Sequence, residues 1–110
     1  MALYMEKPWR PLTAAEVATI PGQLGVYEIA DRDGSILKLG MANALTKFGL
    51  KEALGKELAA RGDGFQFRLE INMQYTTRYK ELLLVHEARH GAPPPENDEP
   101  VGRYGRLSPA

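Results

Sequence analysis

Alternation of apolar and polar side chains predicts one strand clearly, between residues 65 and 73. Every second residue there is apolar and the residues between are polar or charged; the apolar set is Phe65, Phe67, Leu69, Ile71 and Met73. Because successive side chains of a strand point to opposite faces, this strand has one apolar face. Segments 25–30 and 35–40 contain β-forming residues and flank a turn at Asp33-Gly34, which predicts a β-hairpin.

Two stretches before residue 61 have the features of helices. Thr13 and Glu16 form a capping-box pair, so we expect a short helix over residues 14–19. Strong helix formers dominate residues 43–60, with Gly49 placed to break the first turn, and leucines recur at Leu50, Leu54 and Leu58. This periodicity predicts a longer helix with an apolar stripe.

A third helix is expected over residues 77–90, and it is apolar on two sides. The first side comprises Tyr79, Leu82, Leu83, His86 and His90. On the opposite side Glu81 shares a stripe with Leu84, Val85 and Ala88. A helix of this kind packs on two sides, and a carboxylate turned toward a core is costly unless it is paired or bound to a metal. Glu81 is therefore a candidate metal ligand; pairing with Arg78 or exposure at the stripe's margin is the alternative.

The composition is that of a soluble globular protein. The 110 residues suit one domain, and 44% of them are hydrophobic and 25% charged. The 14 Lys and Arg balance the 14 Asp and Glu, so any nucleic-acid site must be local. The absence of cysteine excludes a disulfide framework and a thiol nucleophile. The longest aliphatic run is residues 82–85 and the N-terminus lacks a signal-peptide pattern, so we expect a cytoplasmic protein without a membrane segment.

Both histidines lie in the stretch His-Glu-x-x-His formed by His86, Glu87 and His90. On a helix this spacing sets two imidazoles one turn apart, as in zinc metalloproteases, where the glutamate is the general base. Arg89 argues against zinc because its charge would repel the metal, and a third ligand could come only from acids of the proline-rich tail. We therefore expect no stoichiometric zinc, and a zinc hydrolase is the lesser alternative.

The order of motifs resembles the GIY-YIG nuclease superfamily over about residues 21–97. The stretch GVY, which ends at Tyr27, is similar to the GIY element, and KLG, which begins at Lys38, stands where YIG is expected. Glu81 resembles the metal-binding glutamate of the family. Asn97, in PPPEN, resembles the asparagine that closes the domain near the active site.

The resemblance implies an α+β fold in which helices flank a three-stranded antiparallel sheet, in β-β-α-β-α order. It also implies hydrolysis of DNA phosphodiesters, with Tyr27 activating water and Glu81 holding one Mg²⁺ or Mn²⁺ close to it. Phe48 stands where the phosphate-binding arginine is expected. Lys38 or Lys47 would have to replace that arginine, so we expect weak or absent nuclease activity.

This interpretation divides the chain into three parts. Residues 1–20 are an N-terminal extension with a short helix, residues 21–97 are the GIY-YIG-like domain, and residues 98–110 are a C-terminal tail. The segment after Gly91 is rich in proline and charge, so we expect an extended arm or frayed tail there. A non-catalytic domain of the same fold, which binds nucleic acid or a protein partner, is the main alternative to a nuclease.

Overall fold

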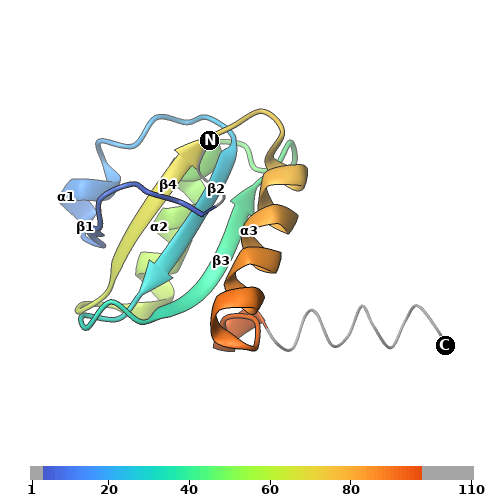
Figure 1. Ribbon diagram of the computed structural model, residues 1–110. Helices are drawn as coiled ribbons and strands as arrows, with labels where there is room; N and C mark the ends of the chain where they lie inside the picture. Colours follow the sequence, from blue (N-terminus) through green and yellow to red (C-terminus); the bar gives the residue numbers. More distant parts are fainter. Residues whose placement is uncertain (1–3, 98–110) are drawn as a thin grey trace, which may run out of the picture.

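The computed structural model describes residues 4–97, which form one antiparallel sheet with helices around it (Figure 1). The strand order is β1-β4-β2-β3; the strands are β1 (Arg10–Pro11), β2 (Gly25–Ala30), β3 (Ile36–Ala42) and β4 (Gln66–Ile71). The helices are α1 (Ala14–Val17), α2 (Gly49–Arg61), α3 (Tyr75–His90) and the short 3-10 helix η1 (Pro95–Asn97). The α+β class is confirmed, and the elements from β2 to α3 follow the order β-β-α-β-α.

The sheet has four strands where three were expected. The additional strand is β1, which pairs antiparallel with the beginning of β4. Two residues cannot display an alternation, and Pro11 has no N–H to donate, so this edge strand leaves no pattern in the sequence. The N-terminal stretch thus extends the sheet, and it also contributes the buried side chains of Met5 and Leu12.

Helices cover both faces of the sheet. In Figure 1, α2 lies behind the sheet and α3 runs beside β3. The core that includes α2 contains Leu12, Val17, Ile20, Tyr27, Ile29, Ala42, Leu50, Leu54 and Phe67. The core that includes α3 contains Met5, Val26, Leu39 and Leu82. The neighbours Val26 and Tyr27 enter different cores, as the pleat of β2 requires. No helix in residues 4–97 combines the length and hydropathy that crossing a membrane requires.

Close packing around β2 requires two glycines. Tyr27 lies opposite Gly40, and a Cβ at Gly40 would lie 2.3 Å from Cζ of the Tyr27 ring. A Cβ at Gly25 would lie 2.1 Å from the backbone oxygen of Glu70 in β4. Only glycine permits such close approach. The GVY and KLG stretches therefore contain glycine because the tyrosine ring and a neighbouring strand occupy the space of a side chain.

The helix expected from residue 43 begins later, at Gly49. The side-chain oxygen of Asn43 accepts the N–H of Leu45, and its backbone oxygen accepts the N–H of Thr46, so the segment folds into a turn. Gly49 has a φ of 59°, and a Cβ there would lie 2.3 Å from the backbone oxygen of Gln23. The helix propensity of the preceding residues is therefore overridden by an asparagine turn and a tight chain crossing.

The chain after α3 is not wholly the extended arm that was expected. η1 packs against β3, and Asn97 keeps only 4% of its surface exposed. Proline and charge suggested a solvated segment, but one buried amide fixes this part of the chain to the sheet. The expected tail of residues 98–110 lies outside the described residues.

Candidate functional site

Tyr27 and Lys38 meet at a carboxylate on the α2 face of the sheet. Lys38 lies opposite Ile29 in the β2–β3 register, so its side chain leaves the sheet on the same face as Tyr27. The Tyr27 hydroxyl donates to Glu57 Oε2 at 2.9 Å, and Lys38 Nζ lies 2.5 Å from the same oxygen. The structure thus brings two of the predicted site residues together, around an acid that was not predicted.

Arg61 completes this cluster from the last turn of α2. Its Nε donates to Glu57 Oε1 at 2.9 Å, and its two terminal nitrogens donate to the carboxylate of Glu96 in η1. Both oxygens of Glu57 therefore accept from protein donors. We call Tyr27, Lys38, Glu57, Arg61 and Glu96 the closed cluster, because each cation in it contacts a carboxylate of the chain.

The protonation states in the closed cluster follow from its pairing. Burial, then the charge and hydrogen bond of Glu57, raise the pKa of Tyr27 far above its ordinary value. Burial alone would raise the pKa of Glu57, but hydrogen bonds and charge from Lys38, followed by bonds from Tyr27 and Arg61, lower it below the usual range. At neutral pH Tyr27 is therefore a protonated donor and Glu57 a carboxylate. A tyrosine held in this way is a poor base toward water.

Asn97 lies at the open edge of β3 and binds its backbone. Its Oδ1 accepts the N–H of Leu39 at 2.7 Å, and its Nδ2 donates to the oxygen of Leu39 at 2.8 Å and to the Tyr79 hydroxyl at 3.0 Å. These bonds satisfy a strand edge as another strand would. Leu39 follows Lys38 in the chain, and the bonds of the Asn97 amide hold η1 to this part of β3.

Glu81 does not meet Tyr27, and this expectation from the sequence was wrong. Its carboxylate contacts Arg78, which also donates to both oxygens of Glu70 at 2.9 and 3.1 Å. Glu70 lies opposite Val26, whose side chain belongs to the α3 core, whereas Tyr27 belongs to the α2 core. The counter-charge comes from Arg78, one turn before Glu81 on the same helix. Pairing with Arg78, the alternative left open by the sequence, is the arrangement found.

The residues present do not fit the divalent ion that the resemblance implies. Mg²⁺ and Mn²⁺ take oxygen ligands with free lone pairs, and nearby cations repel them. Glu81 contacts the guanidinium of Arg78, which also binds Glu70, and Glu57 lies between Lys38 and Arg61. Within residues 4–97 no three His, Asp or Glu side chains gather in a way that could hold a metal.

The other predicted site residues lie elsewhere. Lys47 is in the loop between β3 and α2, where its Nζ lies 5.5 Å from the ring centroid of the exposed Phe48. The rings of His86 and His90 lie side by side on α3, with centroids 4.3 Å apart. Glu96, one of the tail acids that could have completed a zinc site with them, binds Arg61 instead.

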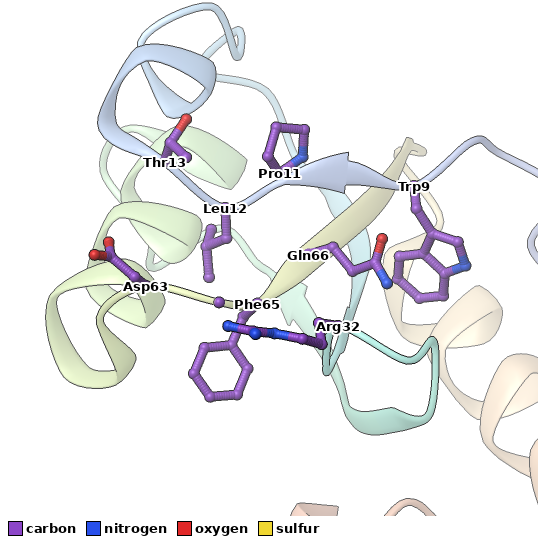
Figure 2. Close-up of a pocket in the computed structure, with 9 residues that line it drawn as sticks. Trp9, Pro11, Leu12, Thr13, Arg32, Asp63, Phe65 and Gln66 are labelled. Carbon is purple, nitrogen blue, oxygen red and sulfur yellow. The ribbon is translucent and has the colours of Figure 1, made fainter.

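A hollow of about 410 Å³ lies beside β1 (Figure 2). Figure 2 shows the Arg32 side chain extending from the β2–β3 turn toward Phe65, and the amide of Gln66 directed toward Trp9. Arg32 and Asp63 both line it and neither has an ion-pair partner in residues 4–97. The hollow therefore has one cation and one anion, which gives no preference for a charged ligand of either sign.

A protein family matches residues 1–89, which include every strand and nearly all of α3. The chain belongs to the family described as a domain of unknown function, DUF7508. No curated protein matches the sequence. The DUF7508 match includes the N-terminal stretch with β1, and it also includes Tyr27, Lys38, Glu57 and Arg61. Glu96 and Asn97 lie beyond it.

Sequence reasoning missed Glu57 and Arg61, the centre of the closed cluster in this DUF7508 domain. A signal was present in the helix period: Glu57 follows Leu50 and Leu54 at seven and three residues, so it continues their stripe. The leucine stripe continues through the next residue, Leu58, and no motif points to Glu57. In the structure Glu57 keeps only 8% of its surface exposed.

Proposed function

We propose that this DUF7508 domain is a non-catalytic interaction domain that binds a protein partner and does not cut DNA. The observation that carries the proposal is the position of Glu57, whose carboxylate lies between Tyr27 and Lys38. A nuclease of the kind that the sequence resembles needs a free base at Tyr27, and with Phe48 at the arginine position it needs a free cation such as Lys38 for the phosphate. Here the carboxylate of Glu57 already binds both side chains.

The relation to the GIY-YIG nucleases is part of the proposal. It is supported by the β-β-α-β-α order and by Gly40, which leaves room for the Tyr27 ring. Loss of activity is supported by the raised pKa of Tyr27 and by the pairing of Glu81 with Arg78. Neither Glu57 nor Glu81 belongs to a set of ligands that suits a divalent ion, so hydrolysis would lack the usual stabilisation of the leaving oxygen by a metal.

Exposed apolar side chains at one end of the sheet support a binding role. Leu45 and Phe48 lie in the loop between β3 and α2, Ile71 ends β4, and Met73 lies in the loop before α3. We call these four residues the loop-end patch. Leu45 is 93% exposed and Met73 is 73% exposed. Apolar clusters of this kind mark interaction surfaces, and Phe and Met are enriched in protein interfaces.

Hydrogen bonds hold the two loops at the same end of the molecule. The N–H of Asn72 donates to the backbone oxygen of Leu24, and the N–H of Leu50 donates to that of Gln23. Lys47 and Lys51 border the patch, and neither has an ion-pair partner in residues 4–97. An apolar patch with a basic border fits a partner segment that is both apolar and acidic.

Two assays test this function. Nicking of supercoiled plasmid with Mg²⁺ or Mn²⁺ should be absent for the wild type and for Tyr27→Phe. Selection from a displayed peptide library should enrich acidic, apolar peptides, and Phe48→Ala should weaken their binding about tenfold, as for an interface hot spot. Val85→Ala, on α3 away from both loops, is the control.

Of three further outcomes, the first and the third would overturn the proposal. Wild-type nicking that is lost in Tyr27→Phe would restore the nuclease. Nicking that appears only in Phe48→Arg would indicate a decayed nuclease and leave the binding role intact. Salt-sensitive binding of a single-stranded oligonucleotide that depends on Lys47 and Lys51, without peptide enrichment, would replace the protein partner by nucleic acid.

A further inference from the structure

The helix end that carries both histidines lines a groove of about 580 Å³. His86, Arg89 and His90 come from α3, Arg68 comes from β4, and Trp9 comes from the stretch before β1. The turn of the β2–β3 hairpin lines it too, through Asp33, Gly34 and Ser35. We call this the histidine groove. Four separate parts of the chain thus bring their polar side chains to one hollow of ligand size.

The cations of this groove differ in how they are paired. Arg68 donates to Glu28 Oε1 at 2.6 Å and lies 4.2 Å from the ring centroid of Trp9. The guanidinium of Arg89 lies over the ring of Tyr4, 4.7 Å from its centroid, and has no carboxylate partner within residues 4–97. A ring contact leaves the edge N–H groups of Arg89 available to a ligand.

The two imidazoles add donors without adding an anion. Neither ring makes a hydrogen bond within the described part of the chain. Burial, followed by the positive charges of His90 and Arg89, lowers the pKa of His86. Asp33 lines the groove at the exposed hairpin turn, but its charge is not a cause of the lowered pKa of His86. Glu28 lines the adjoining hollow with His86, Arg89 and His90, but its carboxylate is paired with Arg68. Neither imidazole and no nitrogen of Arg89 therefore has an ion-pair partner within residues 4–97.

We propose that the histidine groove binds a phosphate dianion, free or as the terminal group of a phosphate monoester. A tetrahedral dianion can accept hydrogen bonds from Arg89 and from both imidazoles at once. Trp9 offers an indole beside the same groove for the organic part of a monoester. The groove lies at the hairpin end of the sheet, whereas the loop-end patch is at the opposite end, so the two proposals stand or fall separately.

The chain has only two histidines, which makes the test direct. Inorganic phosphate and a nucleoside monophosphate are titrated into the full chain, with chloride at equal ionic strength as the blank. Both imidazole NMR signals, assigned through His86→Gln and His90→Gln, should shift with phosphate and not with chloride. The dissociation constant should be about 1 mM or tighter. A monophosphate that binds more tightly than phosphate would identify an organic ligand.

Arg89→Gln should weaken phosphate about tenfold or more, because it removes the charged donor and keeps much of the stem over Tyr4. The matched control is Arg32→Gln, in the neighbouring hollow of Figure 2, which should bind phosphate as the wild type does. Thermal unfolding of each variant shows that it is folded. The proposal would be overturned if the imidazole signals do not shift with phosphate, or if Arg89→Gln binds phosphate as tightly as the wild type.

Discussion

The closed cluster and the histidine groove of this DUF7508 domain differ in the source of the anion that pairs with their cations. In the closed cluster the chain supplies it, since Glu57 and Glu96 contact every cation present. In the histidine groove Arg89 and the two imidazoles face a hollow without a carboxylate partner in residues 4–97. Cations that already contact a carboxylate are engaged within the fold, and cations that do not are available to a ligand.

The comparison also explains why the residues of the resemblance carry less function than their motif suggests. Lys38 and Tyr27 stand at the motif positions, but a partly buried Glu57 turns them into structural donors. A buried charge pair adds little net stability over apolar residues, yet breaking it is costly because the remaining charge loses its partner. Removing an acid should therefore affect the closed cluster far more than removing a cation affects the groove.

Glu57→Ala should give the largest effect, a loss of about 3 kcal/mol in the free energy of unfolding, because Lys38 and Arg61 would lose their common partner. Urea denaturation measures it. The control is Lys56→Ala on the same helix, which removes an ion pair between Glu52 and a lysine side chain that is 78% exposed and should leave the midpoint nearly unchanged. If both variants unfold at the same urea concentration, Glu57 is not the centre of a structural cluster.

Gly40→Ala tests the tyrosine side of the closed cluster and should cost about 2 kcal/mol. The new Cβ would lie 2.3 Å from Cζ of Tyr27, so the ring and its bond to Glu57 must shift. Gly55→Ala is the matched control in α2, where the nearest atom, Cγ1 of Val17, would be 4.0 Å from the new Cβ. It should stabilise the helix by about 0.5–1 kcal/mol. Equal losses for the two variants would show that the Tyr27 ring is not fixed.

The sequence predicted the elements whose patterns are local. The β4 strand alternates along its whole length, and the hairpin has a recognisable turn, so both were expected close to their actual bounds. β1 was missed because its pairing partner lies far along the chain. The start of α2 was misplaced because the turn at Asn43 and the chain crossing at Gly49 depend on contacts that propensity does not contain.

The candidate site was only half predictable, for a similar reason. Tyr27 and Lys38 follow from a motif and from the two-residue period of strands. Glu57 belongs to no motif, and its role depends on how α2 packs against β2. The sequence left open whether Glu81 binds a metal or pairs with Arg78, because Glu70, which also binds Arg78, lies in β4 and not in the same helix. A motif identifies candidate side chains, but their role depends on the residues of distant elements that contact them in the fold.

The free energy of unfolding should also decrease at alkaline pH, because of Tyr27 in the closed cluster. The folded state raises the pKa of Tyr27, so the unfolded chain loses this proton first. The stability that the Tyr27 hydroxyl contributes is complete below the pKa of tyrosine in the unfolded chain, about 10, and is lost as the pH rises above that value. Urea midpoints from pH 8 upward should therefore fall more steeply for the wild type than for Tyr27→Phe. Parallel curves would mean that Tyr27 ionises as easily in the folded chain as in the unfolded one.

The smallest effect is expected for Glu81→Ala, which separates a surface ion pair from a metal site. Arg78 keeps the bidentate contact with Glu70, and the Glu81 side chain is 37% exposed, so the loss of stability should stay below about 1 kcal/mol. Glu70→Ala should cost more, because it removes both of its bonds to a buried Arg78. Paramagnetic broadening by Mn²⁺ gives a second measure. Broadening centred on Glu81 and abolished in Glu81→Ala would restore the metal site, whereas equal broadening in both proteins would leave Glu81 as a partner of Arg78.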